Sequence, residues 1–332
     1  MPSVRFGEHA TALRSFVRPL FTEHHPTRRR TILEACGLIV LCLVHTGLFV
    51  TISYAQRDFS TSLSKKDWPG FVAACWKYVG VIIVAAPSFA QYRYLEGLFC
   101  LHARCWLTER LLERYFADDN FYHIGSTSGI DNPDQRITED VRLFVAQSVG
   151  FVLQVLRMCT ACALLHTACT LHAHCVHTAC TRLQVLGKLL NMVAFCGVLW
   201  SISPLLVAIL LGYSVLGTLV IVKLFGGSIQ MLAFAKLRRE ADLRFALVRV
   251  REHAESIAFF RGGAREEGVA VTRLGRVVET AASLLLVERR LAIFQNVYEY
   301  ATILVPGMVI APRYMAGEVG RAGRVLGAAG VC

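Results

Sequence analysis

The sequence predicts an all-helical protein that crosses a membrane several times. Of its 332 residues, 55% are hydrophobic and only 18% are charged, whereas soluble domains carry about 25% charged residues. Several apolar stretches reach the roughly 20 residues that a helix needs to span a bilayer. Polar stretches rich in Lys and Arg separate them. We therefore interpret the net charge of +11 as basic residues at the cytosolic ends of spans, and we expect no nucleic-acid partner.

The apolar stretches predict about five spans. The basic cluster at residues 28–30 precedes the first span and places an N-terminal segment, residues 1–27, in the cytosol. Residues 228–290 contain twelve Lys and Arg, and the short outer loop at residues 56–70 contains three. This asymmetry places the longer segment inside. The expected spans are residues 32–55, 71–92, one crossing within 143–200, 204–225 and 291–311.

The third apolar stretch is too long for one span and contains a repeat. The tetrapeptide Leu-Gln-Val-Leu at residues 153–156 recurs at 183–186. We interpret residues 157–186 as a low-complexity insertion, from a duplication or translated non-coding sequence. Cys and His, which are zinc-ligand types, recur there between Cys159 and Cys180. Because their spacing is irregular, a metal site is only an alternative interpretation.

Two polar segments between spans face water or a partner. Residues 98–116 continue the second span as a helix, and residues 118–120 and 125–131 break it. Pro133 then favours a new helix start, with acidic residues in the next turn. The second polar segment is residues 237–263. The simplest alternative for both is a solvated helix with ion pairs between residues three or four apart.

An ionisable residue lies within the last predicted span. Glu299 is close to Gln295 and Asn296. A charged group at that depth is costly and usually faces the interior of a helix bundle. We therefore expect these three residues to line a pathway or to make polar contacts between helices.

Several segments resemble one family. Residues 132–141 (NPDQRITEDV) resemble the first intracellular loop of ABC half-transporters of subfamily D, and of bacterial and chloroplast relatives near the SbmA/BacA peptide uptake proteins. Residues 237–262 resemble the second intracellular loop of that group, and their core at 254–260 resembles the part that docks on the ATPase. Residues 57–59 resemble its first outer loop, and residues 299–301 and 311–318 resemble its fifth helix. The resemblance covers about 18–156 and 187–319.

The resemblance implies an exporter-type ABC transmembrane domain over residues 28–319, with helices that extend far into the cytosol. Two copies normally form the pathway, so a homodimer or a heterodimer with another half-transporter is expected. The cargo implied is hydrophobic or amphipathic: a fatty acyl-CoA, a peptide or a cobalamin-like molecule. The membrane implied is that of a plastid or a peroxisome, or the bacterial inner membrane. The residues implied to couple the domain to an ATPase are Gln135, Arg136, Glu139, Asp140, Glu255 and Gly262.

The sequence also departs from the family pattern. It contains no GxxxxGK[ST] phosphate loop and no LSGGQ signature, and residues 320–332 diverge where a sixth helix is expected. We therefore expect no catalytic, cofactor or metal residues on this chain, and expect ATP and Mg²⁺ to bind a nucleotide-binding domain outside it. Three alternatives remain: a proton-driven peptide importer of the SbmA/BacA type, a metal-binding membrane protein, and a truncated, inactive gene product.

Overall fold

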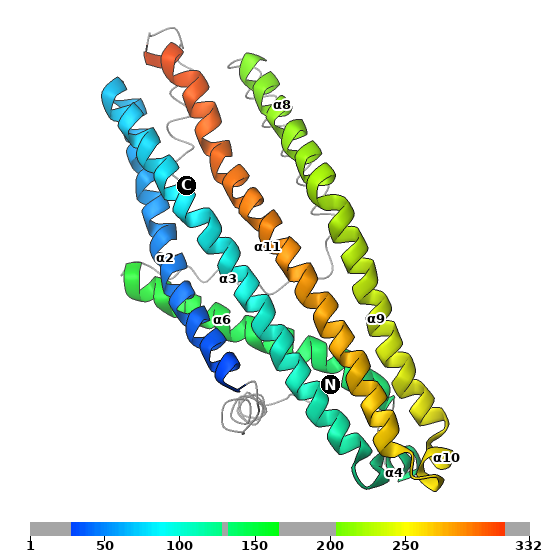
Figure 1. Cartoon of the computed structure of the whole chain (residues 1–332). Helices are drawn as coiled ribbons and strands as arrows, with labels where there is room; N and C mark the ends of the chain where they lie inside the picture. Colours follow the sequence, from blue (N-terminus) through cyan, green and yellow to red (C-terminus); the bar gives the residue numbers. More distant parts are fainter. Residues whose placement is uncertain (1–27, 128–131, 166–203, 316–332) are drawn as a thin grey trace, which may run out of the picture. The chain divides into compact units, whose positions relative to one another are not determined.

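The computed structural model describes residues 28–127, 132–165 and 204–315, and these residues are almost entirely helical (Figure 1). No strand occurs among them. The predicted all-α class is therefore confirmed. In order, the helices are α2 (Arg28–Ser64), α3 (Trp68–Phe116), η1 (Ala117–Asp119), α4 (Asn120–Thr127), α5 (Pro133–Gln135), η2 (Arg136–Asp140), α6 (Val141–Leu165), α8 (Pro204–Ile221), η3 (Val222–Gly226), α9 (Gly227–Glu252), α10 (Ala254–Phe259) and α11 (Gly263–Met315).

Three of the described helical stretches are long and apolar enough to cross a membrane: Arg29–Ser64, Trp68–Ile124 and Val207–Glu252. They contain the first, second and fourth predicted spans. The fifth predicted span lies in α11, where polar residues such as Gln295, Asn296 and Glu299 lower the hydropathy. Most of the third span, with most of the expected insertion, lies outside the described residues. The number of five spans stays a prediction.

The helices are far longer than a bilayer requires. α3 has 49 residues and α11 has 53, so each extends over roughly 75–80 Å at 1.5 Å per residue. About 20 residues would cross the hydrocarbon core. Long extensions beyond the membrane were predicted, and these lengths confirm them. α11 continues through Pro306 and Pro312 to Met315.

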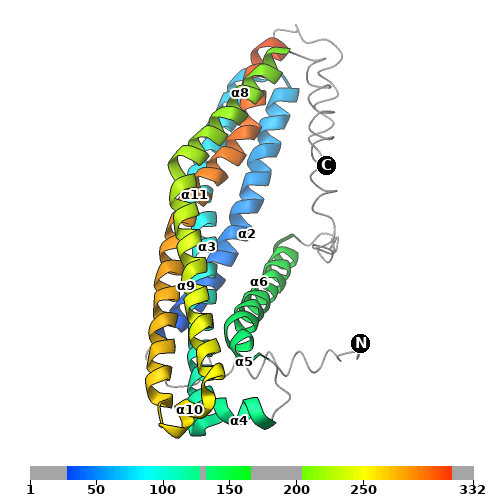
Figure 2. The ribbon, with the colours of Figure 1, turned by 90° about the vertical axis from the view of Figure 1, so that its right-hand side faces the viewer.

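The chain divides into two compact units. The first comprises residues 1–43, 90–159 and 225–290 and includes both polar segments. Within its described part, α9 and the start of α11 run side by side, α10 joins them, and α4 lies at the same end (Figures 1 and 2). An apolar core packs Leu112 and Phe121 against Leu243, Leu247 and Leu274, all at most 2% exposed. This core fixes the position of the joint between α9 and α11.

The second unit comprises residues 44–89, 160–224 and 291–332. In its described part, Phe71, Tyr78 and Phe89 of α3 pack against Ile52 of α2 and Leu304 of α11. Elsewhere α8 presents large apolar side chains outward, which suits contact with lipid. They are Leu211, Val215, Leu216 and Leu219.

Candidate coupling site

The segment after residue 131 begins a helix as predicted. Pro133 is the first residue of α5, a position where the missing N–H of proline costs nothing. Asn132 precedes it in a left-handed conformation, with φ 49°, and makes no side-chain cap. Its side-chain oxygen instead accepts a hydrogen bond from Arg251 Nη1 at 2.9 Å. The start of this helix is therefore held by α9.

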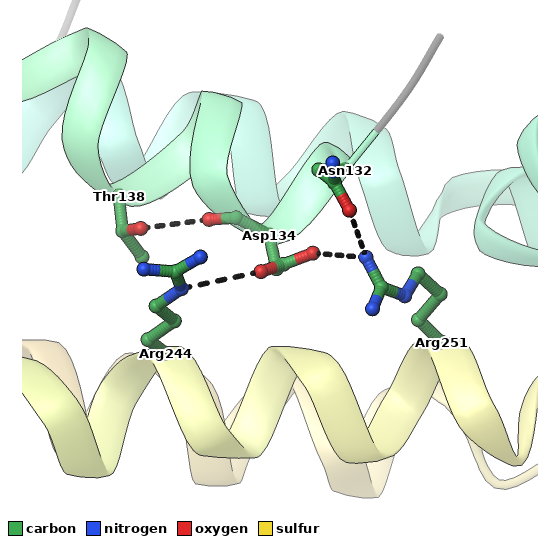
Figure 3. A network of polar contacts seen from close by, with 5 residues as sticks. All are labelled: Asn132, Asp134, Thr138, Arg244 and Arg251. Atoms are coloured by element: carbon green, nitrogen blue, oxygen red, sulfur yellow. Dashed lines mark hydrogen bonds and ion pairs between the residues drawn. The ribbon is translucent and has the colours of Figure 1, made fainter.

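Asp134 is the centre of a polar network that joins this segment to α9 (Figure 3). The residue is only 3% exposed. Its carboxylate accepts a hydrogen bond from Arg251 Nη1 at 2.6 Å and a longer one from Arg244 Nε at 3.4 Å. Thr138 Oγ1 donates to the backbone oxygen of Asp134 at 2.7 Å. A buried carboxylate needs such partners, so the network fixes both the depth and the register of α5 on α9.

Further ion pairs tie α9 to its other neighbours. Arg104 of α3 donates to Glu240 at 3.0 Å, and Arg249 pairs with Glu266 of α11. The alternative of ion pairs within one helix is therefore wrong for Glu240, Arg244 and Arg249. Their partners lie on other elements: Glu240 pairs with α3, Arg244 with α5 and Arg249 with α11.

The predicted residues of the first segment lie beside this network, largely at the surface. Arg136 and Asp140 pair with each other at 2.6 Å, with side chains 61% and 41% exposed. Glu139 pairs with Arg142, and that hydrogen bond holds the pKa of the Glu139 carboxyl below its ordinary value. Gln135 is half-buried. These residues form a charged surface on a segment whose position Asp134 fixes.

The second segment ends in a short tip formed by α10 and the turn that follows it. Arg261 has φ 53°, and the N–H of Gly262 donates to the backbone oxygen of Ile257 at 2.8 Å. This is a Schellman-type helix end, with arginine where glycine is common. Of the two residues predicted here, Glu255 is exposed and Gly262 is half-buried in the turn. Their contact with a partner stays a prediction.

The tip has two different faces. Ala254, Ile257 and Ala258 pack against the apolar core of the first unit. Phe259 and Phe260 point away from it and are 81% and 79% exposed, with their rings in an edge-to-face contact at 5.2 Å. Sequence reasoning missed these phenylalanines as individual site residues, because they do not stand out in a chain this apolar.

The predicted pathway residues lie in the second unit and do not share one environment. Asn296 is 7% exposed and donates to the backbone oxygen of Ala86 at 3.3 Å. Gln295 and Glu299 are exposed. Glu299 is therefore not packed inside the single chain, and its place on a pathway stays a prediction. Asn296 makes the contact between helices instead.

The metal alternative cannot be placed in the described residues. Across residues 28–127, 132–165 and 204–315, no three His, Cys, Asp or Glu side chains gather in a way that could hold a metal ion. The tract between Cys159 and Cys180 lies outside the side chains that the structure describes. Of the cysteines in predicted spans, Cys42 and Cys75 are buried and Cys36 is exposed.

Together these features define a class: an integral membrane protein whose helices extend past the bilayer and carry two cross-linked polar segments at their far ends. Comparison with known proteins gives the family. The chain belongs to the ABC transporter transmembrane region 2 family, whose model matches residues 18–315. The predicted resemblance to subfamily D of the ABC transporters is confirmed.

The relatives are bacterial, plant and animal transporters. The chain is 35% identical over 285 residues to an uncharacterized ABC transporter ATP-binding protein of Synechocystis, a match covering 85% of this chain and 38% of the relative. It is 30% identical over 323 residues to the chloroplastic ABC transporter D family member 2 of Arabidopsis thaliana, covering 96% and 41%. It is 28% identical over 286 residues to the lysosomal cobalamin transporter ABCD4 of Homo sapiens, covering 85% and 42%. The chain thus spans about two fifths of the length of these relatives.

Proposed function

We propose that the chain is the transmembrane half of an ATP-binding cassette transporter and that an ATPase domain docks on residues 132–140 and 254–262. The observation that carries this proposal is the tip, where Phe259 and Phe260 are almost fully exposed beside a buried opposite face. A Phe buries 150–250 Å² when it is covered. Two adjacent exposed rings on an ordered element therefore favour a protein partner.

The packing of the tip favours docking without further ordering. The inner face of α10 is held by the core, and the turn is closed by the Gly262 hydrogen bond. A partner would therefore not have to immobilise the loop, which lowers the entropic cost of association. Glu255 and Arg261, both exposed on the tip, supply charges for the rim of such a contact.

The Asp134 network supplies a means of transmission. It links the first segment to α9, and α9 leads directly into α10. Movement of a docked ATPase would then displace both segments as one body and act on the helices that lead to the membrane. α8, η3 and α9 follow one another without a break from Pro204 to Glu252, so no flexible linker would absorb the displacement.

A second half-transporter, of the same or another chain, is part of this proposal. α9 carries large apolar side chains that are 64–74% exposed although the helix extends beyond the predicted span: Met231, Phe234, Leu237 and Phe245. Exposed apolar residues in this number favour an interface. A partner subunit that covers them would complete the pathway.

The cargo proposed is hydrophobic or amphipathic: a fatty acyl-CoA, a peptide or a cobalamin-like molecule. The human relative is named as a cobalamin transporter, and the Arabidopsis relative is named as chloroplastic. The membrane proposed is accordingly that of a plastid, with a peroxisome or the bacterial inner membrane as alternatives. ATP and Mg²⁺ would bind the ATPase domain.

Removing either exposed ring is expected to weaken docking without unfolding the chain. The test uses the full chain in lipid nanodiscs and the ATP-binding domain of the Synechocystis relative as a probe, with binding followed by biolayer interferometry. We expect Phe259→Ser and Phe260→Ser each to raise Kd at least about tenfold, as for interface hot spots. The control is Phe151→Ser on α6, because Phe151 is 61% exposed but lies in the predicted third span. Equal affinity in all three variants would refute the docking site.

Proton-driven uptake is the second candidate, and it rests on Glu299, an exposed acid in the predicted fifth span. In proteoliposomes, proton-driven transport of a labelled peptide would stop when a protonophore is added and would be lost in Glu299→Gln. The control is Gln295→Ala, which removes an exposed neutral side chain one turn away. We expect ATP-coupled transport to withstand both the protonophore and Glu299→Gln. Loss of transport with the protonophore or in Glu299→Gln would favour the proton-driven candidate.

A further inference from the structure

A small cavity between α9 and α11 is lined by three arginines and one aspartate. Arg239 and Asp242 come from α9, and Arg273 and Arg276 come from α11. All four belong to the first unit, so their arrangement does not depend on the other half of the chain. The cavity measures about 170 Å³. It belongs neither to the Asp134 network nor to the α10 tip.

The positive charge of this cavity is poorly neutralised. The single carboxylate, on Asp242, approaches Arg239 Nη1 no closer than 3.9 Å. Arg273 Nη1 donates to the backbone oxygen of Asp242 and not to its carboxylate. Among the described residues, Arg276 forms no ion pair within 4.0 Å, although Glu279 lies one turn away on the same helix. Three guanidinium groups therefore face one loosely held carboxylate.

Three other arginines of α9 behave differently. Arg244 and Arg251 share Asp134, and Arg249 pairs with Glu266. The chain thus supplies close acidic partners to the arginines that fix its packing. At the cavity, arginines from two helices come together without such close acidic partners. An ordered, concave site with three arginines and one carboxylate carries excess positive charge, which favours an anion.

We infer that this cavity binds a phosphate group of a soluble ligand. Guanidinium groups present planar, paired donors that match the oxygens of phosphate, and such charge-assisted hydrogen bonds are about twice as strong as neutral ones. A water molecule needs roughly 10–15 Å³, so the cavity accepts a tetrahedral oxyanion with several waters. A phosphate held by Arg239 on one helix and by Arg273 and Arg276 on the other would cross-link α9 to α11 near the tip.

The position of the cavity favours a soluble phosphate over a lipid headgroup. Arg239 follows Phe225, the last residue of the predicted fourth span, by 14 residues, and Arg276 precedes Leu291, the first residue of the predicted fifth, by 15. At 1.5 Å per residue both lie roughly 20 Å beyond the ends of the spans. The headgroup region adds only about 5–8 Å on each side of the hydrocarbon core. The arginines therefore lie past the reach of a headgroup.

This inference is independent of how transport is driven, and phosphate binding by the full chain tests it directly. Isothermal titration calorimetry with inorganic phosphate, at constant ionic strength in zwitterionic nanodiscs, is expected to show one saturable site per chain. Arg276→Gln and Arg239→Gln should each raise Kd about tenfold, since each removes one charge-assisted contact. The matched control is Arg290→Gln, because Arg290 is an exposed arginine of α11 outside the cavity. Helical circular dichroism confirms that each variant is folded.

A second arm separates the two sources of phosphate. Repeating the titration in nanodiscs with one fifth anionic phospholipid is expected to leave Kd for inorganic phosphate unchanged. If the anionic lipid competes with phosphate for the parent chain and this competition is lost in Arg276→Gln, the assignment to a soluble ligand is overturned. Absence of saturable binding in both kinds of nanodisc, or an equal loss in Arg290→Gln and Arg276→Gln, would overturn the site itself.

Discussion

Asp134→Asn is expected to lower the free energy of unfolding by about 2 kcal/mol. The amide keeps one oxygen for Arg251 but presents an N–H₂ group to Arg244, so a hydrogen bond is replaced by two donors facing each other. Breaking a fully buried ion pair costs roughly 3–5 kcal/mol. The smaller value applies here because the Arg244 and Arg251 side chains are 54% and 36% exposed, and water can solvate them once the carboxylate is lost.

The measurement is denaturant unfolding in detergent micelles, followed by tryptophan fluorescence. Asp140→Asn is the matched control, because Asp140 lies in the same segment and its pair with Arg136 is exposed on both sides. Exposed pairs contribute only a few tenths of a kcal/mol, so the control should unfold almost like the parent protein. A double-mutant cycle with Arg251→Gln should give a coupling energy above about 1 kcal/mol. A coupling near zero would show that the network does not hold the segment.

Much of the fold follows from local sequence. The long apolar stretches of α2 and α3 and Pro133 at a helix start act within a few turns, and these helices were correctly predicted. The break after Phe116 was also predicted, and Asp118 and Asp119 have left-handed backbone conformations there. Such signals depend on neighbouring residues alone. The extension of α11 beyond its predicted span was instead implied by the family resemblance.

The site was only partly predictable, because its decisive contacts are distant in sequence. Asp134 meets Arg244 and Arg251 across 110 and 117 residues. Within residues 132–141, the sequence does not distinguish the acids Asp134, Glu139 and Asp140 from one another. Only the position of α9 determines which of them is buried. The same limit applies to α11, where Asn296 is buried and Glu299 is exposed. Composition showed that polar residues gather there but not which of them faces a neighbouring helix.

Gly217→Ala is expected to destabilise the second unit although alanine is the better helix former. Tyr213 and Tyr298 stack with ring centroids 4.4 Å apart and planes 4° from parallel. Each hydroxyl donates to the backbone oxygen of the other residue, at 2.8 and 3.2 Å. A Cβ on residue 217 would lie 2.3 Å from Tyr298 Cε2. The ring must therefore move, and with it the stack and both hydrogen bonds between α8 and α11.

The free energy of unfolding is expected to fall by about 2 kcal/mol. Overpacking costs roughly 1–3 kcal/mol, and loss of the ring pair costs roughly 0.5–1.5 kcal/mol. Alanine in a helix offsets up to about 1 kcal/mol of this relative to glycine. Gly212→Ala isolates that gain, since Gly212 lies on the same helix and a Cβ there meets nothing within 4 Å. Gly212→Ala should be neutral or stabilising, whereas Gly217→Ala should be destabilising in the same unfolding assay. If the clash is the cause, Tyr298→Ala removes it, and the double variant Gly217→Ala with Tyr298→Ala should be no less stable than Tyr298→Ala alone. Additive losses would mean that Gly217 matters for a reason other than the space it leaves for the ring.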